Sequence, residues 1–205
     1  MRLLMEALRT VPSSLGVPDD AFTARTIVLV EGMSDQRAVE ALARLRGRDL
    51  AAEGVSVVPM GGAQAIGRFL GVFGPEGLGV RLAGLCDAGE ESDFGRALER
   101  AGLGSSLTRS GMEELGFYVC VEDLEDELIR ALGADAAEAV VEAHGDLGSF
   151  RTLQKQPAWR GRPTDQQLRR FMGSYAGKIT YAPLFVEALA PTQVPRPLDG
   201  LLASI

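Results

Sequence analysis

The sequence predicts an α/β fold: a mostly parallel, four-stranded sheet flanked by helices, with a helical C-terminal extension. Four short runs rich in apolar and β-branched residues alternate with amphipathic segments of about 10 to 15 residues, a pattern typical of βαβ units. The last third of the chain has helical periodicity. The 205 residues are enough for one sizeable core.

The expected strands are the four apolar runs. The first, TIVLVEG (26–32), is a continuous β-branched run of the kind that is buried on both faces of a sheet. The others are VSVVPM (55–60), VRLAGLC (80–86) and GFYVCV (116–121). We expect Ser34 to cap the helix after the first strand and Asp123 to cap the helix after the fourth.

The chain is expected to divide into three parts. Residues 1–23 form a short amphipathic helix and a linker, residues 24–134 an α/β core, and residues 135–205 a helical, basic extension. The N-terminus is a poor signal peptide, and no stretch approaches the roughly 20 apolar residues that cross a bilayer. Cys86 and Cys120 each end an apolar run, which favours buried, reduced thiols and a cytoplasmic location with no membrane contact.

Charge is distributed unevenly along the chain. The net charge of −7 argues against a simple nucleic-acid-coating protein. Residues 151–205, however, carry 8 of the 21 basic and 3 of the 28 acidic residues. This asymmetry suggests a segment that faces nucleic acid. Basic residues that simply lie on solvent-exposed helix faces would explain it equally well. The candidate nucleic-acid-binding residues are Arg151, Lys155, Arg160, Arg162, Arg169 and Arg170.

Acidic residues follow three of the four expected strands. Glu31 follows the first, Asp87 the third, and Glu122–Asp123 the fourth. The carboxyl ends of parallel strands meet at one edge of a sheet, where α/β folds bind ligands. Mg²⁺ prefers oxygen ligands, and a two-metal phosphodiester site needs several converging acids. Asp35 and Glu125 lie close enough in sequence to join this set.

Helix structure offers another explanation for some of these acids. Negative charge at a helix N-terminus contributes roughly 0.3–1 kcal/mol without any metal, which would account for Asp35, Glu90 and Glu91. Capping does not explain Glu31, because it ends an apolar run and precedes a glycine. Glu31 is therefore the strongest candidate ligand. The glycine-rich stretch MGGAQAIG (60–67) favours a tight turn over a phosphate-binding loop, since it lacks a Walker A or GxGxxG pattern.

These motifs together resemble the Toprim domain, the metal-binding module of topoisomerases, DnaG-type primases and several nucleases. The shared motifs are VLVEG with Glu31, the glycine pair after the second strand, and LCDAG with Asp87. The chain is most similar to the OLD-family (overcoming lysogenization defect) nucleases. That branch adds an acid four residues after the first Glu, a DLE-type motif and a late Lys before a helix. Here these are Asp35, EDLED (122–126) and Lys178.

The resemblance implies a Rossmann-like Toprim fold and a DNA nuclease or nickase that cleaves phosphodiester bonds with two Mg²⁺ or Mn²⁺ ions. It implies Glu31 and Lys178 as catalytic residues, with Lys178 stabilising the developing negative charge. The implied metal ligands are Glu31, Asp35, Asp87, Asp123 and Glu125.

Two departures from the family pattern are apparent. Gly89 stands where Toprim domains carry the second Asp of a DxD motif, which weakens metal binding unless Glu90 or Glu91 substitutes. OLD proteins usually carry an N-terminal ATPase, and this sequence has no Walker motif. The expectation is a stand-alone Toprim module, or one that works with a separately encoded ATPase.

Two other functions stay open at this point. One is a non-catalytic Toprim module that binds nucleic acid or a partner, its metal site weakened by Gly89. The other is a phosphatase or phosphotransfer enzyme that acts on small molecules at the same acids. RNA is open as an alternative to DNA. A homodimer is a further expectation, because pairing would enlarge a small basic patch.

Overall fold

Four parallel strands form the centre of the structure, a computed structural model that describes residues 16–205. They are β1 (Thr26–Val30), β2 (Val55–Pro59), β3 (Arg81–Cys86) and β4 (Phe117–Val119), in the order β2-β1-β3-β4. Every neighbouring pair is parallel. The predicted α/β fold is confirmed. The helix expected near the N-terminus falls largely on residues 1–15, outside the described part of the chain.

Both faces of the sheet are buried, which explains why the strands are continuous apolar runs rather than alternating ones. In β1, Val28 faces one core cluster and Ile27 the other. Cys86 and Cys120 are free, buried thiols that belong to different clusters. They therefore face opposite sides of the sheet. Burial raises the pKa of both thiols, so both stay protonated.

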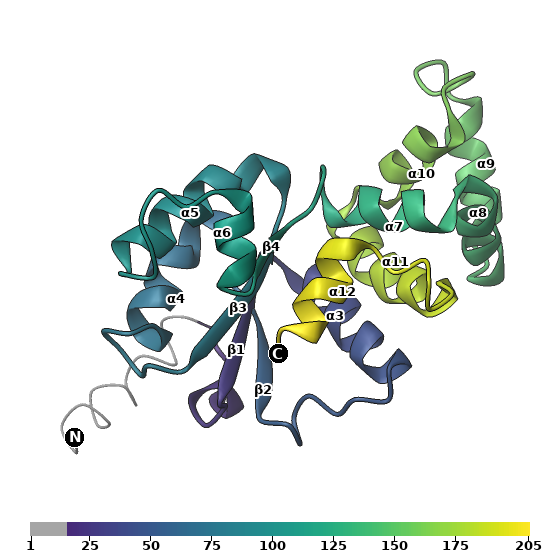
Figure 1. Ribbon diagram of the computed structural model, residues 1–205. Coiled ribbons are helices and arrows are strands. Elements are labelled where there is room, and N and C mark those ends of the chain that lie inside the picture. The colour runs from purple at the N-terminus through teal and green to yellow at the C-terminus, as the bar shows by residue number, and fades with distance from the viewer. Residues whose placement is uncertain (1–15) are drawn as a thin grey trace.

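Helices cover each face of the sheet (Figure 1). One face packs against α4 (Ile66–Phe73), α5 (Glu91–Arg100) and α6 (Arg109–Glu114). The other packs against α3 (Met33–Leu45), α11 (Tyr175–Ala188) and α12 (Arg196–Ala203). Short 3₁₀ helices are η1 (Asp19–Phe22), η2 (Ala63–Ala65) and η3 (Ala88–Glu90). No helix within residues 16–205 is both long and apolar enough to cross a membrane.

A group of helices extends beyond the end of the sheet (Figure 1). It contains α7 (Leu124–Leu132), α8 (Ala134–Ala143), α9 (Leu147–Lys155) and α10 (Thr164–Met172). The chain then returns, because α11 packs along α3 and α12 packs against β3 and β4. At Gly200 of α12 the backbone is so close to the Tyr118 ring that a side chain would clash. The last helices therefore complete the layer over the sheet.

Helix starts near the strand ends differ in part from prediction. Gly32, not Ser34, caps α3, because the Asp35 carboxylate accepts a 2.8 Å hydrogen bond from the Gly32 N–H. Lys178 lies within the first turn of α11 rather than before a helix, since that helix begins at Tyr175. The prediction for Asp123 is confirmed: its Oδ1 accepts a 2.8 Å hydrogen bond from the Asp126 N–H and caps α7.

Candidate metal centre

An acidic cleft lies at the carboxyl ends of the two central strands. From β1 the chain passes through α3 to β2 on one side, and from β3 it passes to β4 on the other. Open α/β sheets bind ligands at such a reversal of strand order. The cleft has a volume of about 450 Å³. Its charged lining residues are Glu31, Asp35, Asp87, Glu125 and Lys178.

Glu31 is held at the end of β1 by the glycine pair that follows β2. The Gly61 and Gly62 N–H groups donate to the Glu31 carbonyl at 3.0 and 3.1 Å. Their φ values of 75° and 124° are ones that residues with side chains rarely adopt. These two N–H groups therefore fix the turn at Glu31 and are not free to bind a phosphate. Burial, followed by the charge of Glu90, raises the pKa of the Glu31 carboxyl, against the opposing charge of Lys178.

Asp35 and Asp87 both line the cleft, and the pKa of each carboxyl is raised. Burial raises the pKa of Asp35 to about 7, although its hydrogen bond from the Gly32 N–H favours the charged form. Burial, with the negative charge of Asp35 next in importance, raises the pKa of Asp87 to about 8. At neutral pH this group of acids therefore retains protons unless another cation balances its charge.

Glu125 and Lys178 close the cleft from the helical side. Glu125 is only 4% exposed, and its Oε2 accepts a 3.0 Å hydrogen bond from Lys178 Nζ. Its Oε1 is buried and makes no hydrogen bond within the described chain. A buried carboxylate oxygen without a partner is costly, so this atom most needs a further ligand. Burial lowers the pKa of Lys178, but Glu125 and other acids raise it overall, so its ammonium stays charged.

Asp123 and Glu90 lie at the rim and do not line the cleft. Both oxygens of Asp123 are engaged, Oδ1 by the Asp126 N–H and Oδ2 by Arg169. Glu90 ends the short η3 helix and affects the cleft through its charge on Glu31. Gly89, in the same turn, is exposed, with open space where a side chain would begin. The structure thus brings five predicted site residues together and leaves two beside them.

The cleft suits a hard divalent cation in its chemistry, because its donors are all oxygens and one of them is buried without a partner. Among residues 16–205, however, no group of three or more His, Cys, Asp or Glu side chains is arranged closely enough to hold a metal ion.

Ser34 is a cleft residue that the sequence led us to interpret differently. It lies in the first turn of α3 and lines the cleft between Glu31 and Asp35. Its predicted capping role is wrong because Gly32 takes that position. Its place between two candidate ligands in one strand-to-helix turn was the available signal.

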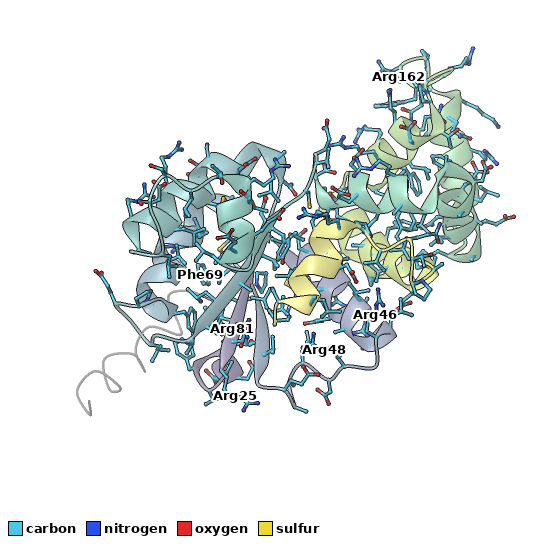
Figure 2. All side chains as sticks on the ribbon, in the orientation of Figure 1. Arg25, Arg46, Arg48, Phe69, Arg81 and Arg162 are labelled. Atoms are coloured by element: carbon cyan, nitrogen blue, oxygen red, sulfur yellow. The ribbon has the colours of Figure 1, made fainter. Side chains whose placement is uncertain are left out.

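The six predicted nucleic-acid-binding residues divide into two groups. Arg151 pairs with Glu138, at 3.0 Å between Nη1 and Oε2, and Arg169 pairs with Asp123. The other four are exposed and make no ion pair within residues 16–205: Lys155, Arg160, Arg162 and Arg170. Arg162 lies at the far tip of the helical group (Figure 2), its guanidinium carbon 5.0 Å from the centre of the Trp159 ring.

Comparison with known proteins gives a family match for part of the chain. Residues 22–88 match the family model for the Overcoming lysogenization defect protein-like TOPRIM domain. These residues include Glu31, Asp35 and Asp87 but neither Glu125 nor Lys178. No curated protein matches the chain.

Solved structures of similar fold come from OLD proteins. The C-terminal region of the Burkholderia pseudomallei OLD protein superimposes with a TM-score of 0.65 and 21% identity, covering 88% of this chain and 96% of that one. The C-terminal region of the Xanthomonas campestris pv. campestris OLD protein gives a TM-score of 0.66 and 22% identity, covering 90% and 95%. The predicted resemblance is confirmed: residues 22–88 match the OLD-like Toprim domain, and the chain as a whole has the fold seen in the C-terminal regions of OLD proteins.

Proposed function

We propose that this protein is a divalent-metal-dependent DNA nuclease or nickase that cleaves phosphodiester bonds. The OLD-like Toprim domain supports a nuclease-related role, and Toprim domains generally bind divalent metals. The observation that carries the proposal is the unpartnered Oε1 of Glu125, buried in the same cleft as three other carboxylates. An all-oxygen site with one unsatisfied donor favours Mg²⁺ or Mn²⁺.

The proposed ligands are the four carboxylates of the cleft, Glu31, Asp35, Asp87 and Glu125. When two such ions are bound, they supply positive charge that stabilises the attacking and leaving oxygens of the phosphodiester. Binding would also remove the protons that Asp35 and Asp87 retain at neutral pH, since a cation favours the charged carboxylate. Metal affinity is therefore expected to rise with pH.

Lys178 and Glu31 are the proposed catalytic residues. The Lys178 ammonium stays charged and lies in the cleft, where it can stabilise negative charge that develops on a phosphate. Glu31 is half-buried at the end of β1, and its carboxylate would hold a metal ion in the cleft. The two groups would thus supply metal binding and charge stabilisation for cleavage of a phosphodiester.

Cleavage of supercoiled plasmid with Mg²⁺ or Mn²⁺ tests the proposal. Wild type is expected to produce nicked or linear product, and Glu31→Gln to be at least about 100-fold slower, because the neutral amide is a much weaker metal ligand than the carboxylate it replaces. Glu76→Gln makes the same chemical change at an exposed site outside the cleft and is the matched control. Equal rates for wild type and Glu31→Gln would remove the catalytic claim.

DNA is the proposed substrate because exposed basic residues gather in the helical group. Lys155, Arg160, Arg162 and Arg170 have no acidic partner in the described chain, and Trp159 adds an aromatic face beside Arg162. Gel-shift titrations with double- and single-stranded DNA at several salt concentrations test this role. Affinity is expected to fall with salt, and less steeply for Arg162→Gln than for wild type.

A non-catalytic Toprim module is the second candidate function, and Gly89 favours it. The site of the family's second Asp holds no carboxylate, and nothing lies within 4 Å of where a Cβ would stand. Gly89→Asp is therefore expected to fold normally. If wild type binds DNA without cutting it and Gly89→Asp gains metal-dependent cleavage, the non-catalytic function is the correct one.

A further inference from the structure

Arg169 of α10 is a fixed positive charge beside the cleft. Its guanidinium pairs with Asp123 and also lies 3.5 Å from Glu122 Oε2 and 4.0 Å from Asp126 Oδ1. These three carboxylates belong to the turn that starts α7, the helix that carries Glu125 into the cleft. Arg169 therefore joins the helical group to the acidic motif of the cleft.

Asp123 links Arg169 to the cleft without lining it. Its side chain is 17% exposed, and both carboxylate oxygens are engaged, one by the Asp126 N–H and one by Arg169. Its negative charge nevertheless reaches the cleft, where it raises the pKa of Glu31 and of Asp87. A cation bound by the cleft carboxylates would attract Asp123 as well, and would then compete with Arg169 for the Asp123 carboxylate.

We propose that Arg169 and a divalent cation compete for the Asp123 carboxylate, so that filling the cleft with metal releases α10 from the start of α7. Arg169 is a positioning residue in this scheme, because it acts on the cleft through Asp123. The inference rests on the proposed metal dependence of the cleft, but it does not require that DNA be cleaved.

Other contacts keep α10 folded when Arg169 is lost. Leu168 and Met172 are fully buried in the core cluster. Gln167 is buried and joins α10 to the preceding segment, accepting from Gln154 Nε2 and donating to the Trp159 carbonyl, both at 2.8 Å. The Arg169 contact is therefore one that the helix can exchange without unfolding.

Titration calorimetry with Mn²⁺ alone tests the inference. Arg169→Gln is expected to bind Mn²⁺ about three- to tenfold more tightly than wild type, the range expected for losing one competing, partly exposed ion pair. Arg170→Gln is the matched control, because it removes the same charge one residue away at an exposed position with no ion pair in the described chain. At physiological salt this control is expected to match wild type.

Three further measurements separate competition from general electrostatics. In an Asp123→Asn background, whose Asn still caps α7, the gain from Arg169→Gln is expected to disappear. In wild type, Mn²⁺ is expected to speed hydrogen exchange at the amides of α10. Arg169→Lys, which keeps the charge in one ammonium group, is expected to lie between wild type and Arg169→Gln in affinity. It also provides a test if the Gln variant fails to fold.

The outcomes distinguish this inference from the proposed function. If wild type binds Mn²⁺ and Arg169→Gln binds it no more tightly than Arg170→Gln, the competition is wrong and the metal site stands. Weaker binding by Arg169→Gln also overturns it, since Arg169 would then assist the metal. If wild type binds no Mn²⁺ or Mg²⁺, the proposed metal dependence itself fails.

Discussion

The two sides of the cleft are built in different ways. On the sheet side, Glu31 and Asp87 follow adjacent strands whose backbones are paired in register. On the helical side, Glu125 and Lys178 lie 53 residues apart and meet only because α7 and α11 pack together. The sheet side depends on main-chain geometry, whereas the helical side depends on side-chain pairing.

This difference predicts how each side responds to change. A backbone substitution should disturb the sheet side through stability, because hydrogen bonds and glycine conformations hold it in place. A side-chain substitution should disturb the helical side through charge, with little effect on folding. Four experiments test the contrast, from the largest expected effect to the smallest.

Lys178→Gln should have the largest effect and act on activity. Removing a positive charge that stabilises developing negative charge lowers rates by about 100- to 1000-fold. The cleavage rate with Mn²⁺ measures this effect, and the unfolding midpoint is expected to change far less. Arg68→Gln, which also removes a positive charge but at an exposed site outside the cleft, is the control. A rate for Lys178→Gln equal to that of the control would contradict a catalytic role.

Gly62→Ala should affect the sheet side through stability. At φ 124° an alanine is strained, and such backbone strain costs of order 1–3 kcal/mol. The hydrogen bond from residue 62 to the Glu31 carbonyl is expected to weaken, so metal affinity should fall too. Urea unfolding and Mn²⁺ titration measure the two effects. Gly89→Ala has open space and no such φ, and should leave stability nearly unchanged.

Sequence reasoning located the sheet side better than the helical side, for a physical reason. Parallel strands bring their carboxyl ends to one edge, so a strand pattern alone places Glu31 and Asp87 near each other. Pairing between α7 and α11 depends on tertiary packing, which no local pattern encodes. Lys178 was therefore located only through a family resemblance.

Two details could not be predicted from the sequence, because more than one side chain or backbone group was available for the same hydrogen bond. Asp35 turns back to the Gly32 N–H and moves the start of α3 ahead of Ser34. Asp123 and Arg169 could each be assigned a separate role from sequence, as a metal ligand and a DNA contact. In the structure they form an ion pair across 46 residues of sequence, which no local pattern predicts.

The third experiment measures how stability depends on pH in the absence of metal, which tests the titration of the cleft acids Asp35 and Asp87. Asp35 and Asp87 have folded-state pKa values of about 7 and 8, raised above ordinary values. The folded state therefore binds more protons than the unfolded state from about pH 4 to pH 8, and stability falls as pH rises through that window. With chelator present, the unfolding midpoint is expected to drop by several degrees between pH 5 and pH 8.

Asp87→Asn should flatten this pH dependence, because the amide does not titrate. Glu76→Gln, at an exposed site outside the cleft, should leave the slope as in wild type. Adding Mn²⁺ at pH 8 should recover the lost stability in wild type, since a ligand that binds only the folded state stabilises it. A slope that is the same in wild type and Asp87→Asn would show that protonation of Asp87 is not coupled to folding.

Arg48→Ala should have the smallest effect, because it acts on the helical layer far from the cleft. Figure 2 shows Arg48 beside the C-terminal end of the chain. Its guanidinium donates to a backbone oxygen of Ile205 at 2.9 Å and pairs with Glu53. Partly exposed charged contacts of this kind contribute up to about 1 kcal/mol. Amide exchange in α12 is expected to rise first, with a small drop in global stability.

Arg44→Ala is the control for this last experiment, since its contact with Glu187 is exposed and spans 3.8 Å. It should leave exchange in α12 unchanged. The cleavage rate should also stay the same in Arg48→Ala, because α12 packs on β3 and β4 without lining the cleft. A large loss of cleavage in Arg48→Ala would mean that the layer over the sheet and the helical side of the cleft are one cooperative unit, and the contrast between the two sides would no longer hold.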